Sequence, residues 1–291
     1  MDRRGGWCVD GFVPAVEPPP DAADREGWWF AFRQGDLFLV EGADGALLPV
    51  RARDPAALGL AIVRRQYLGT IAGHPCWSAE LDDAAENPPE PGFHGLRTLF
   101  GRLPETFYAV AGRAAQIVAW ERDHRFCGRC ATATAPVLGE RARRCPECGL
   151  TAYPRVSPAV IVLIEKGDRI LLARGHHFPS GRFGIVAGFV EAGESLEEAV
   201  AREVAEEVGL HLRDVRYCGS QPWPFPHNLM VGFRAEWAAG DIAIAPSELA
   251  EAGWYGLDDL PNIPPKLSIA RRLIDDWAAR HGRVIADEAS W

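Results

Sequence analysis

The chain has 291 residues, of which 47% are hydrophobic and 24% are charged, and its formal net charge at pH 7 is −9. This length is enough for two packed domains, and the balance is that of an ordinary globular protein. The sequence contains no run of about 20 apolar residues, so no membrane-spanning helix is expected. An acidic chain is also a poor candidate for binding long nucleic acids by charge alone. Because the arginines near the N-terminus precede no apolar run, no secretory signal is predicted and a cytoplasmic location is expected.

Residues 1–95 are expected to form an N-terminal β-rich domain. The aromatic run Trp28–Phe32 and the apolar run Leu37–Val40 flank a short turn that contains Gly35. This arrangement predicts a β-hairpin. A proline cluster at 88–91 marks an expected change of structural unit.

Residues 96–126 are expected to form a connecting segment. Within it, apolar side chains recur at helical spacing from Glu105 to His124. This periodicity predicts a helix that leads directly into Cys127.

A short, turn-rich segment, 127–150, contains two Cys-x-x-Cys pairs, Cys127 with Cys130 and Cys145 with Cys148. Two such pairs supply the four ligands of a tetrahedral Zn²⁺ ion. Since four cysteines leave no open coordination position, the predicted zinc site is structural. The alternative of two redox pairs would need a thioredoxin-like strand and helix, which this segment does not contain.

Arginines are concentrated around these cysteines, at Arg122, Arg125, Arg129, Arg141, Arg143, Arg144 and Arg155. They could bind the phosphates of a nucleotide or of an RNA chain. They could also form a solvated basic face that balances an acidic chain, and this second interpretation is favoured.

From residue 156 the pattern changes to that of a layered α/β domain. Continuous apolar strands are predicted at Ala159–Ile164 and Arg169–Ala173, and strands are expected to alternate with helices to the end of the chain. The last helix is predicted at Ile269–Arg280, with Ser268 as its N-cap.

The segment after Gly188 predicts a loop followed by a helix. Ser195 and Glu198 form a capping box, and Gly209 supplies a left-handed stop. Between them Leu196, Ala199, Val200, Val204 and Val208 form an apolar stripe that should pack against a sheet.

Glu203, Glu206 and Glu207 stand at positions i, i+3 and i+4 of this helix and therefore share one face. Carboxylates so close together repel one another unless a cation neutralises them, and Mg²⁺ and Mn²⁺ prefer such oxygen ligands. An acid-rich surface helix without a metal is the alternative, and the three glutamates alone do not exclude it.

The spacing of the whole segment favours the metal site. Residues 188–210 match the signature G-x5-E-x7-R-E-U-x-E-E-x-G-U, where U is aliphatic, at Gly188, Glu194, Arg202, Glu203, Val204, Glu206, Glu207, Gly209 and Leu210. The segment thus resembles the Nudix hydrolases. The resemblance implies an α/β/α sandwich over 156–280 and divalent-cation-dependent hydrolysis of a nucleoside diphosphate. It implies that Glu203, Glu206 and Glu207 are catalytic and bind Mg²⁺ or Mn²⁺, while Glu194 and Arg202 form a supporting ion pair.

A proline-rich loop, Ser220–Asn228, follows the helix. Its prolines fix the directions of Trp223 and Phe225, which could stack on a flat ring or only pack the domain edge. The loop resembles the SQPWPFPxS motif of the NADH pyrophosphatase branch of Nudix enzymes, which also carries a four-cysteine zinc ribbon. The resemblance implies cleavage of NAD(H) to nicotinamide mononucleotide and AMP, removal of NAD caps from RNA in bacteria, and a homodimer.

The same resemblance implies further site residues. Ala187, through its carbonyl group, and Glu248 would be additional metal ligands. The implied substrate contacts are Arg97, Glu140, Tyr153, Phe189, Gln221, Pro222, Trp223, Pro224, Phe225, Pro226, His227, Asn228 and Ala270. Asn228 departs from the motif, which ends in serine, and this puts ring selectivity in question.

Two other functions compete with this one. A Nudix hydrolase for ADP-ribose or dinucleoside polyphosphates is the nearer alternative, and the proline-aromatic loop speaks against it. A sensing module that binds a nucleotide without cleaving it is the second. Because every glutamate of the signature is present, this second alternative is disfavoured.

Overall fold

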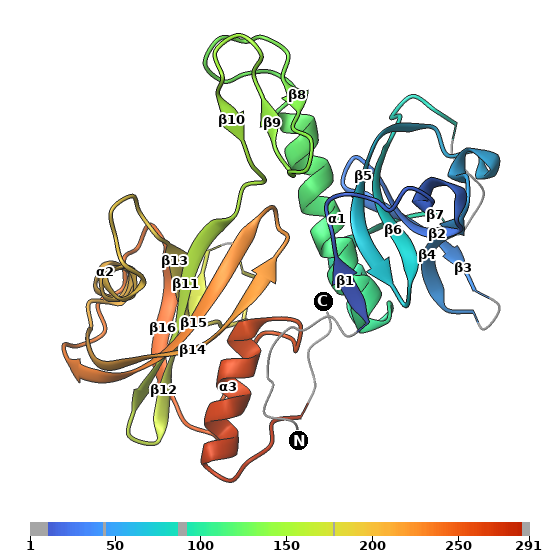
Figure 1. Ribbon diagram of the computed structural model, residues 1–291. Helices are drawn as coiled ribbons and strands as arrows, with labels where there is room; N and C mark the ends of the chain where they lie inside the picture. The colour runs from blue at the N-terminus through green and yellow to red at the C-terminus, as the bar shows by residue number, and fades with distance from the viewer. Residues whose placement is uncertain (1–10, 43–44, 87–91, 177, 287–291) are drawn as a thin grey trace. The chain divides into compact units, whose positions relative to one another are not determined.

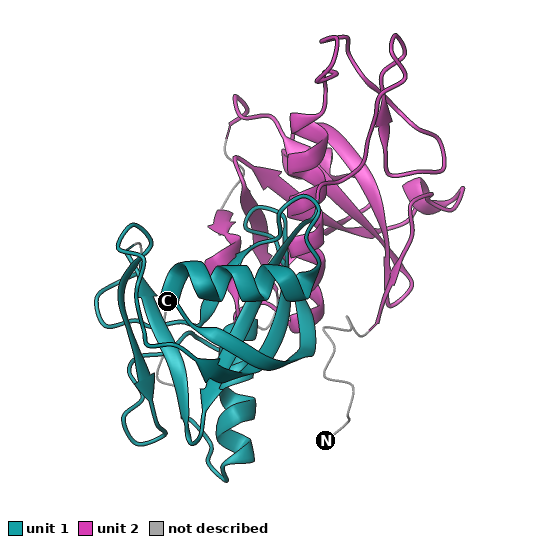
Figure 2. Cartoon of the chain, turned by 90° about the vertical axis from the view of Figure 1, so that its left-hand side faces the viewer, with its two compact units in different colours: residues 1–7, 156–291 teal, residues 8–155 magenta. Residues whose placement is uncertain are grey.

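The computed structural model describes residues 11–42, 45–86, 92–176 and 178–286. The chain divides into two compact units, one of Cys8–Arg155 and one of Met1–Trp7 with Val156–Trp291 (Figure 2). The segments 1–95, 96–126 and 127–150, which we expected to be separate, therefore fall largely in one unit. The boundary expected at 88–91 lies outside the described residues.

The first unit contains a seven-stranded sheet among its described residues, with the order β1-β5-β6-β2-β4-β3-β7. Its strands are β1 (Phe12–Pro14), β2 (Gly27–Arg33), β3 (Asp36–Glu41), β4 (Leu47–Ala52), β5 (Ile62–Ile71), β6 (His74–Leu81) and β7 (Gly92–Gly95). Short 3₁₀ helices lie at Ala22–Asp24, Pro55–Leu58 and Leu96–Leu99. The predicted hairpin is confirmed, since β2 and β3 pair around Gln34 and Gly35, which have φ of 52° and 94°.

Helix α1 (Glu105–Asp123) confirms the predicted connecting helix to within one residue. It packs on the sheet through Phe107, whose ring centroid lies 4.7 Å from that of Trp28. The cysteine segment follows as a small sheet of β8 (Ala135–Pro136), β9 (Arg143–Arg144) and β10 (Thr151–Ala152), in the order β10-β9-β8 (Figure 1). We call residues 122–155 the ribbon segment.

Two of the arginines around the cysteines do not belong to a solvated face, and our favoured interpretation was wrong for them. Arg141 donates to the carbonyl oxygens of Ala15 at 3.1 Å and Tyr67 at 2.6 Å. Arg143 lies 3.2 Å from the Glu121 carboxylate and also donates to Thr134. Because guanidinium groups satisfy several acceptors at once, these two side chains attach the ribbon segment to the sheet and to α1.

The second unit is a sheet with one helix on each face (Figure 1). Its strands are β11 (Ser157–Lys166), β12 (Arg169–Gly175), β13 (Val186–Phe189), β14 (His211–Trp223), β15 (Asn228–Ala239) and β16 (Leu249–Tyr255). Helix α2 (Leu196–Val208) buries Val200 and Val204 on one face, and α3 (Ile269–Arg280) buries Leu273 and Trp277 on the other. This architecture confirms the expected α/β/α sandwich.

The expected alternation of strands and helices is wrong. The strand order is β14-β15-β11-β12-β16, with β13 paired to β11, and among the described strands of this sheet only the β11–β15 pair is parallel. Between α2 and α3 the chain forms the long hairpin β14–β15 and then β16, because antiparallel neighbours need only a tight turn and no crossover helix. The predicted last helix is confirmed, and the Ser268 hydroxyl accepts a hydrogen bond from Arg271 N at 3.3 Å.

In the part of the chain that the structure describes, none of the helices has the length and apolar character needed to cross a membrane.

Candidate active site

The acidic helix α2 is set in place by its two ends. The Ser195 hydroxyl accepts from Glu198 N, and the Glu198 carboxylate accepts from Ser195 N at 2.8 Å, so the predicted capping box is confirmed. Gly209 ends the helix with φ of 69°, a left-handed conformation that glycine adopts without steric cost. The apolar side of α2 packs on the sheet, which fixes the direction of its opposite, acidic side.

The three glutamates on that acidic side differ in exposure. The side chain of Glu206 is 57% exposed, whereas that of Glu203 is 12% exposed and Glu207 is buried. Burial, together with the negative charges of Glu203, Glu248 and Glu206, raises the pKa of Glu207 to about 7, and burial is the larger cause. Burial is also the main reason that the pKa of Glu203 is raised. The helix therefore holds carboxylates in a place that disfavours their own negative charge.

Arg202 connects this helix to the preceding loop. Its guanidinium donates to both Glu194 oxygens, at 2.5 and 2.9 Å, and to the Phe189 carbonyl oxygen at 2.9 Å. It also donates to Glu203 and Glu206, each at 2.9 Å. The predicted Glu194–Arg202 ion pair is confirmed, and the hydrogen bonds from Arg202 hold the pKa of Glu194 down at about 2. Arg202 thereby orients two of the glutamates as well as the loop.

Strand β13 lies directly against the Glu203 carboxylate. A Cβ atom added at Gly188 would be 1.9 Å from Glu203 Cδ, so only glycine fits beside the Glu203 carboxylate in its present position. The neighbouring Ala187, expected to be a metal ligand through its carbonyl oxygen, occupies the same short strand. Phe189 follows with 56% of its surface exposed, as a ring that stacks on a substrate would require.

Glu248 approaches the same glutamates from the segment before β16. The backbone N–H groups of Ala243 and Ala245 donate to the carbonyl oxygens of Val208 and Glu207, each at 2.9 Å. This pairing fixes the segment beside the C-terminal turn of α2, and the charge of Glu248 raises the pKa of both Glu203 and Glu207. A fourth carboxylate therefore faces the acidic side of the helix.

This donor set fits a divalent cation. It combines carboxylate oxygens with a nearby backbone carbonyl group, the ligands that Mg²⁺ and Mn²⁺ prefer. No arginine, lysine or histidine of the described residues forms an ion pair with Glu207, so this buried carboxylate has no cationic partner from the protein there. The carboxylate oxygens of these glutamates do not lie close enough together to form a ready-made metal cluster in the described structure. Those of Glu203 and Glu206 are instead bound by Arg202.

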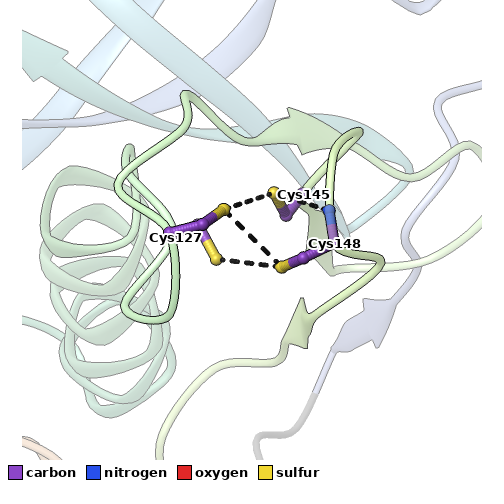
Figure 3. Close-up of side chains that lie close together, drawn as sticks. Cys127, Cys145 and Cys148 are labelled. Carbon is purple, nitrogen blue, oxygen red and sulfur yellow. Dashed lines mark hydrogen bonds between the residues drawn. The ribbon is translucent and has the colours of Figure 1, made fainter.

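The cysteines are drawn together much more tightly. The sulfur atoms of Cys127, Cys130, Cys145 and Cys148 all lie within 4.8 Å of one another, and the shortest separations are 3.4 and 3.5 Å (Figure 3). In a tetrahedral zinc site with Zn–S bonds of about 2.3 Å, the sulfur atoms are about 3.8 Å apart. The backbone N–H groups of Arg129 and Cys148 point at the sulfur atoms of Cys127 and Cys145, and the hydrogen bond from Arg129 lowers the pKa of Cys127. The cluster therefore fits the predicted structural zinc.

The proline-aromatic loop forms the tip of the β14–β15 hairpin. The rings of Trp223 and Phe225 meet edge to face at 5.2 Å, and Phe225–Pro226 is a cis peptide. His227 is anchored to β11, because its carbonyl oxygen accepts from Ser157 N at 3.0 Å. Pro224 and Pro226 lie in the turn and Pro222 lies near the end of β14, and Pro222 and Pro226 are exposed.

Gln221 differs from our expectation of an amide that is free to meet the substrate. Its side chain is buried, donates to the Leu267 carbonyl oxygen and accepts from Ile269 N, both at 2.7 Å. It thus ties the loop to the start of α3. The methyl group of Ala270, another expected substrate contact, is likewise buried, in the core beneath α3. Asn228 Oδ1, by contrast, is a buried acceptor without a partner in the described residues, and a substrate donor could fill it.

The remaining expected substrate residues belong to the first unit. Tyr153 is 58% exposed, and its hydroxyl donates to Glu140 at 2.8 Å, so the structure brings these two together. Arg97 is exposed in the 3₁₀ helix Leu96–Leu99. That these three side chains contact the substrate stays a prediction.

Sequence reasoning missed the extent of the Arg202 network and the Ser157–His227 link. The signature places an arginine beside Glu203, but nothing in the spacing shows that its guanidinium reaches Glu206 and the Phe189 carbonyl oxygen as well. Ser157 lies far from His227 along the chain, and only the pairing of β11 with β15 joins them.

Comparison with known proteins agrees with this site. The chain matches family models described as the NUDIX domain at residues 154–277, the NADH pyrophosphatase zinc ribbon domain at 122–153 and the NADH pyrophosphatase-like rudimentary NUDIX domain at 26–120. It is therefore a Nudix hydrolase with a zinc ribbon. A solved Nudix hydrolase from Nitrosomonas europaea shares 23% identity with it, covers 56% of this chain and 96% of its own, and gives a TM-score of 0.47.

Its relatives define the branch more narrowly. A Pseudomonas fluorescens protein named NAD-capped RNA hydrolase NudC is 44% identical over 260 residues, which cover 88% of this chain and 92% of the relative. A Deinococcus radiodurans protein of the same name is 45% identical over 279 residues, which cover 94% and 93% of the two chains. The chain belongs to this NudC branch of the Nudix hydrolase family.

Proposed function

We propose that this protein hydrolyses the pyrophosphate bond of NAD(H), giving nicotinamide mononucleotide and AMP, and removes NAD caps from RNA 5′ ends. The observation that carries the proposal is the set of carboxylates around the buried Glu207, whose pKa is raised to about 7. The names of its relatives support the choice of substrate. The proline-aromatic loop supports it too, because Trp223 and Phe225 offer ring faces for stacking.

Glu203, Glu206, Glu207 and Glu248, with the Ala187 carbonyl group, would hold Mg²⁺ or Mn²⁺. When bound, such cations neutralise the diphosphate, polarise its oxygens and lower the pKa of a coordinated water. Arg202 keeps two of these carboxylates oriented before substrate arrives, which reduces reorganisation during the reaction.

The loop would position the other end of the substrate. Phe189, Trp223 and Phe225 present aromatic surface, and Asn228 presents an unpaired acceptor. A homodimer, implied by the family resemblance, and a cytoplasmic location, expected from the N-terminal sequence, belong to the same proposal.

The test compares NADH, NAD⁺, NAD-capped RNA and ADP-ribose as substrates with Mg²⁺ and with Mn²⁺, with products identified by mass. We expect Glu207→Gln to lower kcat on NADH by about a hundredfold or more while the thermal unfolding profile stays that of a folded protein. Wild-type protein that leaves NADH and NAD-capped RNA intact with both metals would overturn the proposal. Faster cleavage of ADP-ribose than of NADH would favour the alternative Nudix activity.

A further inference from the structure

The ribbon segment departs from the charge of the chain as a whole. The chain carries a net charge of −9, whereas residues 122–155 contain seven arginines against three acidic residues, Asp123, Glu140 and Glu147. Arg141 and Arg143 are used internally, in bonds to backbone carbonyl groups and to Glu121. The positive charge that remains is therefore at the surface.

Most of the remaining arginines lack an acidic partner. Arg122 pairs with the neighbouring Asp123, but Arg125, Arg129, Arg144 and Arg155 form no ion pair within the described part of the chain, and all four are exposed. On an ordinary solvated face, positive and negative side chains are interspersed. An array of guanidinium groups without acidic partners instead fits a polyanion, because such groups bind phosphates through hydrogen bonds and charge.

Exposed aromatic rings accompany these arginines. Phe126 is 62% exposed immediately before the first zinc-binding cysteine, and the Arg125 guanidinium lies over its ring at 6.0 Å from the centroid. Arg144 is paired with Thr151 across β9 and β10, and Tyr153, itself 58% exposed, follows β10 directly. Rings beside cations are typical of surfaces that bind single-stranded nucleic acid, where bases stack and phosphates are neutralised.

The fold makes this surface rigid. Phe126 is bridged to Ala133 within the zinc-binding turn, and Thr134 N donates to the Arg125 carbonyl oxygen at 2.9 Å. Arg144 is held in β9 between β8 and β10, and its Nε donates to the Thr151 hydroxyl at 3.2 Å. The backbone of these residues is thus ordered before a ligand arrives, which reduces the entropic cost of binding.

We propose that the exposed ribbon surface of Arg125, Phe126, Arg129 and Arg144 binds the single-stranded RNA body that follows an NAD cap. The surface takes phosphates on its guanidinium groups and stacks a base on Phe126. This inference rests on the proposed function for its substrate. It assigns the zinc ribbon a second task beyond its own folding, which is to favour capped RNA over free dinucleotide.

The experiment compares the wild type, the triple variant Arg125→Gln/Arg129→Gln/Arg144→Gln, and Phe126→Leu. The probes are NADH, a short NAD-capped single-stranded RNA, and the same RNA with a 5′-monophosphate for equilibrium binding. We expect unchanged kcat/KM on NADH for both variants and a KM on capped RNA raised about tenfold or more. In the triple variant the slope of log Kd against log salt for the uncapped RNA should be smaller by about 0.7 for each arginine that contacted a phosphate. Phe126→Leu should weaken binding without changing that slope.

The matched control is Arg53→Gln/Arg169→Gln/Arg213→Gln, which removes the same charge from exposed arginines outside the ribbon segment. Wild-type affinity and salt slope in the triple ribbon variant, or an equal loss in the control, would overturn the proposal. Retained NADH cleavage in that case would leave the proposed function standing. The uncapped RNA tests the ribbon surface even for a wild-type protein that cleaves no dinucleotide.

Discussion

The Glu203 carboxylate occupies the space in which a side chain at Gly188 would lie. At Gly188 the backbone does not require glycine, because its φ lies outside the left-handed region, so the constraint comes from space alone. An added Cβ would lie within 2.2 Å of three atoms of the Glu203 carboxyl group. The glycine of the signature is explained by the room that the carboxylate needs.

Gly188→Ala should therefore displace the Glu203 carboxylate. We expect kcat on NADH to fall by about a hundredfold, with a much smaller effect on stability because the Glu203 side chain can rotate away. Gly128→Ala is the matched control, since nothing lies within 4 Å of its added Cβ. Kinetics and thermal unfolding of both variants check the prediction, and wild-type kcat in Gly188→Ala would contradict it.

Glu194 should contribute to stability in a pH-dependent way. The Arg202 guanidinium lowers the pKa of this carboxyl group from 4.5 to about 2. A depressed pKa stabilises the folded state at pH values above the unfolded pKa, and this contribution is lost as the pH falls towards 2. Glu194→Gln should therefore lower Tm near pH 6, and its difference from the wild type should shrink steadily between about pH 4.5 and pH 2. A difference in Tm that stays constant over this range would show that the ion pair has no such role.

At the scale of elements, the sequence predicts local structure well. The capping box, Gly209 and the apolar stripe all act within one helix, so spacing alone specifies α2 and its acidic face. The β2–β3 hairpin is predicted for the same reason. The order of the strands in the seven-stranded sheet could not be predicted in this way. Strand β2 pairs in parallel with β6, which is distant in sequence, and no local sequence pattern indicates that pairing.

The sequence also did not predict the side chains that form hydrogen bonds between different helices, strands and loops. Gln221 is a polar residue next to a loop and was therefore expected to bind the substrate. Its side-chain amide instead connects β14 to the start of α3. Arg141 is a charged residue and was therefore expected at the solvated surface. Its guanidinium instead donates to the carbonyl oxygens of Ala15 and Tyr67, which are far away in sequence. In both cases the partner is a backbone group, which leaves no signature in a sequence.

Gln221→Leu tests the bridge between the loop and α3. The substitution keeps the size of the side chain but leaves the Leu267 carbonyl oxygen and Ile269 N without this partner, at about 1–3 kcal/mol for each buried group. We expect Tm to fall by several degrees and KM for NADH to rise, since the loop loses its anchor. The neighbouring Ser220→Ala serves as a control for disturbance of β14. An unchanged Tm would show that the two hydrogen bonds contribute little.

At the scale of the whole molecule, each compact unit has its own core. The first unit buries Trp29 and Trp77, which stack at 5.6 Å, and the second buries Val204 and Trp277 on opposite faces of its sheet. The cysteine cluster belongs to the first unit and the acidic helix to the second. The predicted zinc ion and the proposed catalytic carboxylates therefore lie in different units of the chain.

Cys145→Ser should consequently lose zinc and loosen the ribbon segment while α2 keeps its protection. Backbone amides exchange with the free energy of the cooperative unit to which they belong, and a structural zinc contributes folding energy to its own unit. We expect faster hydrogen exchange in residues 122–155, a lower Tm and zinc content near zero, with unchanged exchange in α2. Cys218→Ser is the matched control, because this half-buried cysteine lies in β14 and should leave the zinc in place. Faster exchange throughout α2 on loss of zinc would show instead that the two units unfold together.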